Sequence, residues 1–352
     1  MDKLKIGVIF GGMSTEHDVS ISSGTSIISN LDKQKYEILP IYISQNGEWY
    51  RYTKPVQEIV PLHVGDEITE LEKIENEFKY LRNLDVAFPV LHGLYGEDGT
   101  IQGLLELLNV KYVGCKVLGS SICMDKVYAK IVFDKAEIPQ ADYAYVKAEN
   151  NQYTYVYKNF DEEILDLEQI SKKIENELGL PVFVKPSNSG SSVGISKAET
   201  IQELKQAIEY ASKYDTKILI EEEIVGREIE CAVLGNTDVK ATCVGEILPA
   251  EDFYTFDAKY NNAQSRVVIP AEVEKEKQEE IRNLAKKAFK AVDGKGLSRV
   301  DFFIKKSNNK VYINEINTLP GFTQISMYPK LWEQCGIEYS KLLDELIKLA
   351  QN

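Results

Sequence analysis

The chain is poor in the residues that would place it in several large classes of protein. Among its 352 residues are three histidines and five cysteines, and no Cys-x-x-Cys pair occurs, so we expect no zinc site. The odd number and wide spacing of the cysteines predict a reduced, cytoplasmic protein, with buried thiols at Cys231 and Cys243. No apolar run approaches the roughly 18–20 residues of a membrane-spanning helix, so we expect no membrane association.

Positive charge is also scarce. Lys and Arg together number 41 against 55 Asp and Glu, which gives a formal net charge of −14. A general nucleic-acid binder needs a basic face, so this class is not favoured. Any anionic substrate must be held by a few local cations. The apolar stretch at residues 6–10 is too short for a signal peptide.

What remains is an ordinary globular composition, with 43% hydrophobic and 27% charged residues. Strand and helix patterns alternate over residues 1–115, which predicts a parallel sheet with covering helices. The pattern changes in residues 116–215 and again in residues 216–352, so we expect three domains. Residues 249–270 carry few structural signals, and an irregular segment of that length is typical of a lid.

The expected elements follow from hydrophobic periodicity. Strands are predicted at residues 4–10, 36–43, 85–91, 153–157, 182–185, 217–222, 228–234, 242–247, 299–304 and 311–317. Helices are predicted at residues 19–31, 100–108, 124–136, 201–214, 275–292 and 339–349.

Two neighbouring strands near the end of the chain carry a cluster of polar residues. If a three-residue turn places Lys306 opposite Lys310, Asp301 lies opposite Glu315 and Arg299 lies opposite Asn317, all on one face. Two carboxylates and an amide oxygen without Cys or His are ligands that suit Mg²⁺. The alternative is a solvated hairpin face with a surface ion pair.

A second candidate site is the Ser/Gly-rich segment that follows Lys185, which reads PSNSGSSVG. Small residues let backbone N–H groups approach phosphate oxygens, and hydroxyls add further donors. The segment is not a Walker A loop, because the lysine precedes the glycines. A plain hairpin turn is the alternative reading. Lys126 is a further candidate cation.

Taken together, these segments resemble the D-alanine–D-alanine ligases of the ATP-grasp superfamily over nearly the whole chain. The resemblance rests on five segments in the family's order: residues 11–20 (GGMSTEHDVS), 92–103 (HGLYGEDGTIQG), 185–194 (KPSNSGSSVG), 253–260 (FYTFDAKY) and 314–332 (NEINTLPG, then SMYPKLW).

The resemblance implies a fold and a reaction. The fold is a three-domain ATP-grasp α/β architecture, with a Rossmann-like N-terminal sheet and with ATP between the sheets of the central and C-terminal domains. The reaction joins two D-alanines into D-alanyl-D-alanine, with ADP and phosphate as the other products, and the dipeptide enters peptidoglycan. The family's homodimer is expected here as well.

The resemblance also implies a role for each matching residue. Contacts with the D-alanines are expected from Glu16, His92, Lys259, Tyr260, Ser326 and the Met327 backbone. Contacts with ATP are expected from Lys126, Lys185, Ser191, Ser192, Glu221, Glu222, Ile224, Glu228 and Lys259. Two Mg²⁺ (or Mn²⁺) ions are expected on Asp301, Glu315 and Asn317. The catalytic set is Glu16, Ser191, Arg299, Gly321, Ser326 and Tyr260: Arg299 and the Gly321 amide would stabilise the oxyanion, and Tyr260, Glu16 and Ser191 would form a hydrogen-bonded triad that locks the lid.

Related ligases make D-alanyl-D-lactate or D-alanyl-D-serine. The family's D-lactate enzymes use a histidine in place of the Lys-Tyr pair, whereas Lys259-Tyr260 is intact here. The D-serine type often has an arginine where Met327 stands. These features favour D-alanine. The alternatives from other classes are a non-catalytic ATP-binding regulatory protein and a kinase that stops at phosphoryl transfer.

Overall fold

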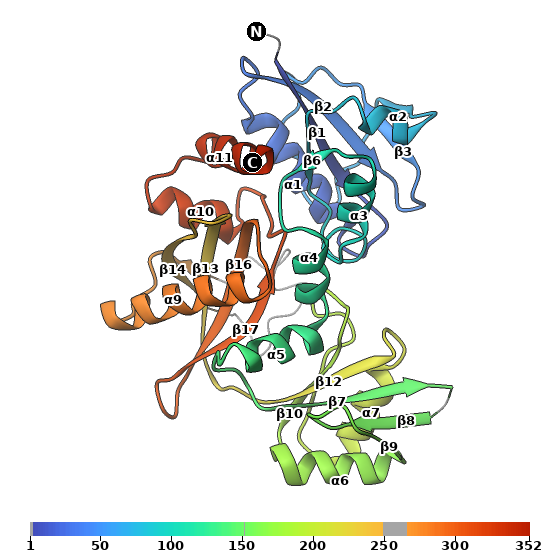
Figure 1. The fold of residues 1–352 in the computed structure, drawn as a ribbon, viewed down its shortest axis with the longest axis vertical. Coiled ribbons are helices and arrows are strands. Elements are labelled where there is room, and N and C mark those ends of the chain that lie inside the picture. The colour runs from blue at the N-terminus through green and yellow to red at the C-terminus, as the bar shows by residue number, and fades with distance from the viewer. Residues whose placement is uncertain (1–2, 151, 249–265) are drawn as a thin grey trace.

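The computed structural model describes residues 3–150, 152–248 and 266–352. Over these residues the chain forms three sheets, which follow one another in the sequence and occupy separate parts of the molecule (Figure 1). The expected lid at residues 249–270, with Lys259 and Tyr260, lies almost wholly outside the described residues.

The first sheet is parallel at its centre and antiparallel at one edge. Strand β1 pairs on both sides and is buried because hydrophobic clusters pack on both of its faces. Its strands are, in spatial order, β4 (Leu71–Lys73), β3 (Trp49–Tyr52), β2 (Tyr36–Ile43), β1 (Leu4–Gly11), β5 (Val86–Pro89) and β6 (Lys111–Tyr112). Its helices are α1 (His17–Asn30), α2 (Glu77–Leu81) and α3 (Thr100–Leu107). The predicted strand–helix alternation is confirmed.

The second sheet is antiparallel. Its strands are β11 (Ser196–Ala198), β10 (Val182–Pro186), β12 (Lys217–Glu222), β7 (Tyr143–Glu149), β8 (Gln152–Val156) and β9 (Glu162–Leu165). Helices α6 (Leu167–Leu178) and α7 (Ile201–Ala211) cover one face and share a core with Ile218 and Ile220. Alternation along the strands therefore turns Lys185, Leu219 and Glu221 to the opposite face.

The third sheet is also antiparallel. Its strands are β15 (Arg266–Val268), β14 (Lys240–Leu248), β13 (Gly226–Gly235), β16 (Gly296–Lys305) and β17 (Val311–Asn317). Helix α9 (Lys275–Ala291) covers one face, and α10 (Met327–Gln334) packs against β13 and β14.

Two linking segments hold the domains together. Helices α4 (Val117–Met124) and α5 (Lys126–Lys135) lead from the first sheet to the second. The last helix, α11 (Tyr339–Gln351), returns to the first domain, beside α1 in Figure 1. Its buried leucines share one hydrophobic core with residues of α1 and β1. The N-terminal and C-terminal domains are therefore not independent bodies.

The second sheet extends beyond the boundary expected at residue 215. Strand β12 (Lys217–Glu222) pairs with β10 and β7, not with the strands that follow it. A division close to residue 222 fits this pairing better.

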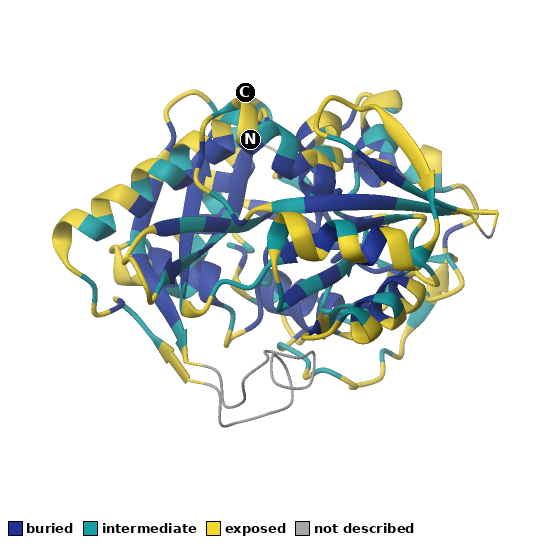
Figure 2. Cartoon of the chain, turned by 90° about the horizontal axis from the view of Figure 1, so that it is seen from below, coloured by how far each residue is buried: buried dark blue, intermediate teal, exposed yellow. Residues whose placement is uncertain are grey.

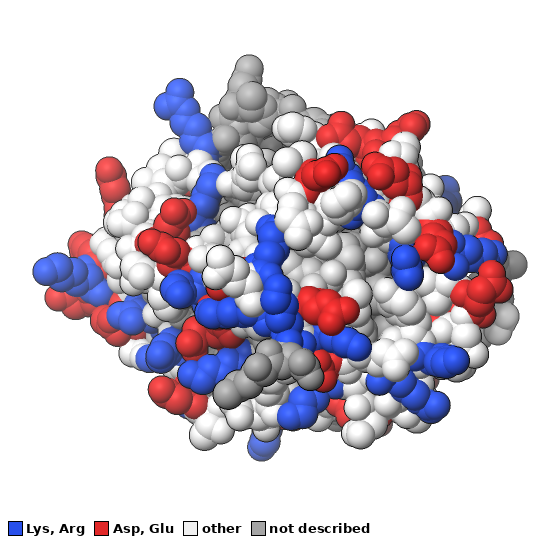
Figure 3. Space-filling model, turned by 90° about the horizontal axis from the view of Figure 1, so that it is seen from above, with Lys and Arg blue, Asp and Glu red and all other residues white. Residues whose placement is uncertain are grey.

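Burial follows this layout. In Figure 2 the strands are mostly dark blue, and the helices expose their outer sides. Basic and acidic side chains are interspersed over the face drawn in Figure 3. Among the described helices, none is long and apolar enough to cross a bilayer.

Candidate functional site

The three domains meet where the carboxyl ends of β1 and β5 approach the inner faces of the other two sheets. Glu16 follows β1 and His92 follows β5, as expected for ligand-binding residues of a parallel sheet. Ser191 follows β10, and Arg299 lies on β16. The pKa of His92 responds to Glu16 and to Arg299, so these segments converge.

The register of β16 and β17 places the predicted polar residues together. Asp301 pairs with Glu315, and Arg299 pairs with Asn317, as predicted. The predicted turn is wrong: the amide N–H of Lys305 donates to the carbonyl of Lys310 at 2.9 Å, one residue away from the expected register. An irregularity between Asp301 and Phe302, which leaves Asn314 as an extra residue in β17, restores the pairing.

Arg299 lies partly buried among acidic groups. Its Nε and Nη2 atoms contact the two carboxylate oxygens of Asp301 at 2.8 and 2.7 Å. Its Nε also lies 3.1 Å from Glu230 Oε2, and Glu230 faces Asp301 across β13 and β16. Burial by itself would lower the pKa of Arg299, but the neighbouring carboxylates, Glu315 included, raise it well above its usual value. The guanidinium is therefore permanently charged.

The expected metal ligands form an oxygen-rich group beside this arginine. Asn317 Nδ2 donates to Asp301 Oδ2 at 2.9 Å. A half-turn of the Asn317 amide would present its oxygen instead. No cluster of three or more His, Cys, Asp or Glu side chains with metal-binding geometry occurs in the part of the chain that the structure describes. The donor set of two carboxylates and one amide still suits Mg²⁺, which takes its remaining ligands from phosphate and water.

A narrow cavity separates the second sheet from β17. Residues from α4, α5, both facing sheets and the β17 irregularity line it: Cys123, Lys126, Ala129, Lys130, Phe133, Lys185, Leu219, Glu221, Asn314, Glu315 and Ile316.

Two lysines hold Glu221 inside this cavity. Its oxygens lie 2.6 Å from Lys130 Nζ and 2.7 Å from Lys185 Nζ. Burial would raise the pKa of Glu221, but the two ammonium groups lower it to about 2. The pKa of Lys185 responds in turn to Glu315 and Glu228 on the facing sheet. The cavity therefore combines lysines that could hold phosphate with acids that could hold a metal ion or ribose.

The Ser/Gly-rich segment after β10 is anchored at the start of α5. Asp125 caps this helix by accepting from the Tyr128 amide, and it also accepts from Ser187 Oγ at 2.6 Å. Lys217 forms an ion pair with the same carboxylate. Lys126 Nζ donates to the Ser189 carbonyl at 2.5 Å. The two predicted phosphate-binding elements are thus one connected unit.

Glu16 joins the N-terminal domain to this loop. The Ser191 hydroxyl donates to Glu16 Oε1. A Cβ at Gly190 would lie 2.5 Å from Glu16 Oε2, and one at Gly93 would lie 2.8 Å from it. The glycines therefore allow the close approach. Ser191 and Ser192 have φ values of 49° and 62°, a strained conformation typical of ligand clamps.

His92 and Glu97 connect the first domain to the loop after β17. The His92 ring contacts the Leu319 carbonyl at 3.0 Å and Ser23 Oγ at 2.9 Å, and burial lowers its pKa, so the ring is neutral. Glu97 accepts from the Gly93 and Leu319 amides, both at 3.1 Å. Burial, followed by the charge of Glu16, raises the pKa of Glu97 to about 7.

Gly321 and Ser326 face each other across a tight turn. A Cβ at Gly321 would lie 2.7 Å from Ser326 Oγ, and this hydroxyl accepts from the Thr323 amide at 2.9 Å. The Met327 side chain is buried against Gly245, so its backbone is the part that remains for a ligand.

The other predicted ATP contacts lie at the margin of the cavity. Glu222 pairs with Lys305 at 2.9 Å and so joins the second sheet to the third. Ile224 is half-buried in the connection between β12 and β13, and Glu228 lies on β13. Lys259 and Tyr260 lie outside the described residues.

Five residues of this site were not predicted from the sequence: Asp125, Lys130, Lys217, Glu97 and Glu230. Lys130 follows Lys126 by four residues and so shares its helical face, a signal that was available. Glu230 lies two residues from Glu228 in an alternating strand, so its face was also predictable. The contacts of Asp125 with Lys217 cross distant segments and left no local signal.

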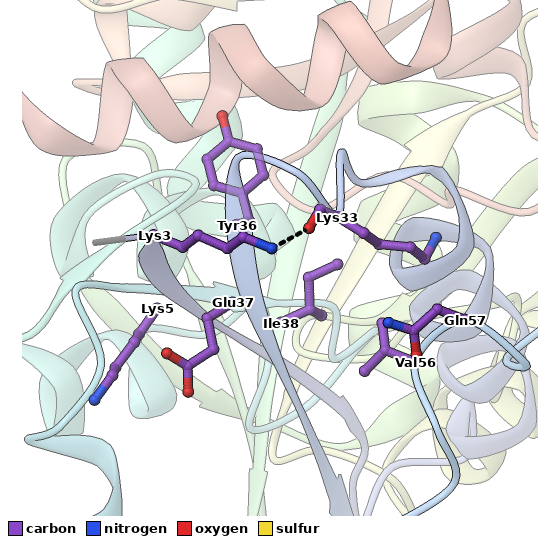
Figure 4. Close-up of a pocket in the computed structure, with 8 residues that line it drawn as sticks. All are labelled: Lys3, Lys5, Lys33, Tyr36, Glu37, Ile38, Val56 and Gln57. Atoms are coloured by element: carbon purple, nitrogen blue, oxygen red, sulfur yellow. Dashed lines mark hydrogen bonds between the residues drawn. The ribbon is translucent and has the colours of Figure 1, made fainter. Parts of the chain in front are cut away.

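A larger cavity elsewhere does not belong to the site. It lies where β1 and β2 begin, among Lys3, Lys5, Lys33, Tyr36, Glu37, Ile38, Val56 and Gln57, and Lys3 Nζ donates to the Lys33 carbonyl there (Figure 4). Ligands of parallel sheets bind at the opposite, carboxyl ends of the strands. The site between the domains is therefore the candidate active site.

Two facing sheets that enclose buried lysines and acids, combined with a parallel-sheet domain, define a three-domain ATP-grasp fold. Two family models match: "D-ala D-ala ligase N-terminus" over residues 5–115 and "D-ala D-ala ligase C-terminus" over residues 132–348. The chain belongs to the D-alanine–D-alanine ligase family.

Individual relatives agree with this placement. The chain is 52% identical over 351 residues to a D-alanine–D-alanine ligase of Clostridium acetobutylicum, with 99% of this chain and 98% of the relative covered. Two solved structures are similar at 36% identity. The VanG D-Ala:D-Ser ligase of Enterococcus faecalis has a TM-score of 0.84, with 99% of this chain and all of the other covered. The D-alanine–D-alanine ligase of Coxiella burnetii has a TM-score of 0.81, with 100% and 94% covered.

Proposed function

We propose that this protein joins two D-alanines into D-alanyl-D-alanine at the expense of ATP, and so supplies peptidoglycan synthesis. The observation that carries the proposal is the cavity between the domains. Lys126 and Lys185 line one side of it and Glu315 lines the other, so phosphate-binding cations face metal-binding oxygens. The D-alanine–D-alanine ligase of Clostridium acetobutylicum, 52% identical, supports the choice of substrate.

ATP would occupy this cavity. Lys126, Lys185, Ser191 and Ser192 would contact its phosphates, and Glu221, Glu222, Ile224 and Glu228 would lie near its adenine and ribose. Asp301, Glu315 and Asn317 would hold two Mg²⁺ (or Mn²⁺) ions, which neutralise phosphate charge when bound. Lys185 would have to leave Glu221, at least in part, to reach a phosphate.

The first chemical step makes an acyl phosphate. A carboxylate oxygen of the first D-alanine attacks the γ-phosphorus of ATP, a new P–O bond forms, and the bond to ADP breaks. Glu16 would orient this substrate through its ammonium, near His92. Positioning and electrostatic stabilisation dominate such phosphoryl transfers, and Lys185 would neutralise the developing charge.

The second step makes the peptide bond. The amine of the second D-alanine attacks the acyl carbon, an oxyanion forms, and phosphate leaves as the amine loses a proton. The permanently charged Arg299 and the Gly321 amide would stabilise the oxyanion. Ser326 and the Met327 amide would hold the carboxylate of the second substrate. The parts assigned to Lys259 and Tyr260 stay predictions.

The second substrate could instead be D-serine or D-lactate. The similar D-Ala:D-Ser ligase of Enterococcus faecalis keeps the first of these open. D-alanine is favoured because the more similar relative is named for it, at 52% against 36% identity. A non-catalytic ATP-binding protein is disfavoured, because the chain keeps Arg299 and the three metal-ligand candidates, and these four residues pair across β16 and β17.

A direct assay distinguishes these functions. Purified protein with ATP and Mg²⁺ is given D-alanine alone, or D-alanine with D-serine or D-lactate, and the phosphate released and the mass of the product are measured. We expect D-alanyl-D-alanine with one phosphate per dipeptide. A mixed product in preference would reassign the second substrate, and ATP consumption without any dipeptide would contradict the ligase assignment.

We also propose a homodimer in the cytoplasm. The surface around α3 and α4 carries exposed apolar side chains: Leu107 is 85% exposed and Leu118 is 58% exposed. Helices α3 and α4 contact each other, and apolar side chains exposed on neighbouring helices are typical of an interaction surface. Sedimentation equilibrium at micromolar concentration should give twice the mass of the chain, and a single-chain mass would contradict the dimer.

A further inference from the structure

The five cysteines, all within the described residues, fall into two groups. Cys115, Cys123 and Cys231 are buried. Burial raises the pKa of Cys115 to about 11 and that of Cys231 to about 12, so both remain protonated and unreactive. Cys335 is exposed and Cys243 is half-buried. The sequence-based prediction of a buried thiol therefore holds for Cys231 and is wrong for Cys243.

The second group forms a contact between two elements far apart in the sequence. Cys243 lies on β14 and Cys335 follows the last residue of α10. The Cys243 amide donates to Cys335 Sγ at 3.2 Å. Cys243 Sγ is joined to that amide nitrogen through only Cα and Cβ, so rotation about the Cα–Cβ bond changes its distance to the other sulfur. The two thiols are therefore neighbours.

The surroundings favour the thiolate of Cys335. The Cys243 thiol and amide donate to it and, together with the positive charge of Arg282, lower its pKa below the usual value. Arg282 is held in place by the Ala241 carbonyl, which accepts from its Nη2 at 3.1 Å. A thiolate that is exposed to solvent is the form that reacts with oxidants.

We propose that Cys243 and Cys335 form an oxidisable dithiol, a modification site that hydrogen peroxide converts reversibly into a disulfide between β14 and α10. The Cys335 thiolate attacks one peroxide oxygen, an S–O bond forms, the O–O bond breaks, and the hydroxide released takes a proton to become water. Cys243 then loses its proton and attacks the sulfenic sulfur, an S–S bond forms, and the second oxygen leaves as water. Peroxide is reduced and two thiols are oxidised.

The order of the two steps follows from exposure and hydrogen bonding: Cys335 is exposed and accepts from the Cys243 amide, whereas Cys243 is half-buried. The interaction with Cys335, followed by burial, raises the pKa of Cys243, so Cys243 is the weaker nucleophile at first. Oxidation of Cys335 removes the thiolate, and with it much of the cause of this shift. Cys243 then becomes able to resolve the sulfenic acid.

Peptide mapping tests the proposal on the intact protein. After mild treatment with hydrogen peroxide and alkylation, we expect one disulfide-linked peptide pair that contains Cys243 and Cys335 and that disappears after reduction. Cys115, Cys123 and Cys231 serve as internal controls and should be recovered alkylated after unfolding. Recovery of Cys335 as a free thiol, or only as a sulfinic acid, would overturn the proposal.

Two variants separate the roles of the pair. Cys243→Ala should accumulate a sulfenic acid on Cys335 that a 1,3-diketone probe traps, because the resolving thiol is gone. Cys335→Ala should give no trapped product at residue 243. Thermal unfolding of both variants shows that they are folded. Equal trapping at both positions, or trapping at neither, would contradict the assigned order.

Discussion

At the scale of single residues, Arg299 and its acidic neighbours stabilise each other's charges. Its guanidinium is bound by Asp301 on the same strand and by Glu230 on the next one. Three carboxylates around one arginine, counting Glu315, leave an excess of negative charge. This excess holds the arginine at the position of its proposed role and would attract the proposed Mg²⁺ ions.

Replacement of Arg299 by alanine should reduce turnover. Removal of one oxyanion donor typically costs about 10²–10³ in turnover, and we expect a loss in this range in the phosphate-release assay. Arg227→Ala is the matched control, because Arg227 pairs with Glu246 in the same sheet but outside the cavity. Near-normal turnover of folded Arg299→Ala would refute the role.

Glu221 should stabilise the fold in a pH-dependent way. Its pKa is lowered to about 2, so its contribution is fully present above its unfolded pKa and is lost as the pH falls toward 2. A pKa shift of this size corresponds to about 3 kcal/mol in the free energy of unfolding. In urea unfolding, Glu221→Gln should be less stable than the parent by about this amount at pH 7, and the difference should narrow below pH ~4.5.

The control for this change is Glu168→Gln. Glu168 also lies between two lysines, Lys172 and Lys205, but its side chain is 47% exposed. Exposed ion pairs contribute little, so we expect Glu168→Gln to lose much less stability than Glu221→Gln. If both variants lose the same stability at every pH, the buried cluster around Glu221 has no special effect.

At the scale of elements, Asp125 connects α5, β12 and the loop after β10. An asparagine at position 125 would still cap α5. It would replace the carboxylate that pairs with Lys217 by a neutral amide, so the loop should lose an ion pair that holds it in place. Hydrogen bonds to charged groups contribute about 1.5–3 kcal/mol. We expect Asp125→Asn to raise the KM for ATP about tenfold or more and to leave the KM for D-alanine nearly unchanged.

The capping residue of α6 provides the control for Asp125. Asp166 caps α6 with a reciprocal capping box and has no contact with the phosphate-binding loop. Asn and Asp are nearly equivalent caps, so Asp166→Asn should change neither KM. A matching change in both variants would mean that only helix capping matters.

The strand pair β16–β17 shows what the sequence could and could not predict. The alternation of polar residues gave the correct pairing of Asp301 with Glu315, but the turn was misplaced by one residue. Val311, Ile313 and Ile316 are all buried with α9. This breaks the period of two, since strict alternation would bury Glu315 with Ile313. That break was a readable signal of the irregularity at Asn314.

Other elements left weaker signals. Strands β1, β2 and β12 lie where their apolar patterns predicted them. Strand β7 was not predicted, although it joins β12 to β8 in the middle of the second sheet. Its sequence, YAYVKAE, mixes strand-favouring tyrosines and a valine with alanines, a lysine and a glutamate, so its local preference is ambiguous. Its conformation depends on pairing with neighbours distant in sequence.

At the scale of the whole molecule, the last helix of the chain packs against the first domain. Helix α11 buries Leu342, Leu343 and Leu346 in one core with Ile27 and Ile28 of α1. Tyr36 Oη also donates to Asp344 at 2.9 Å. Periodicity predicted this helix but not its partner, because amphipathic spacing identifies the buried face and not what covers it. The first and last helices therefore hold the N-terminal and C-terminal domains together.

The shared core predicts that the N-terminal and C-terminal domains unfold together. Leu346 is fully buried, and its replacement by alanine should cost about 2–5 kcal/mol. Because α11 contacts both domains, Leu346→Ala should lower the midpoint of one common transition rather than create a separate early one. Ile164→Ala, at a site 62% exposed on β9, is the matched control and should leave this midpoint unchanged. The measurement is calorimetric unfolding, followed in parallel by the fluorescence of Trp49 in the first domain and Trp332 in the third. Two separate unfolding midpoints in the Leu346→Ala variant would show that α11 does not couple the domains.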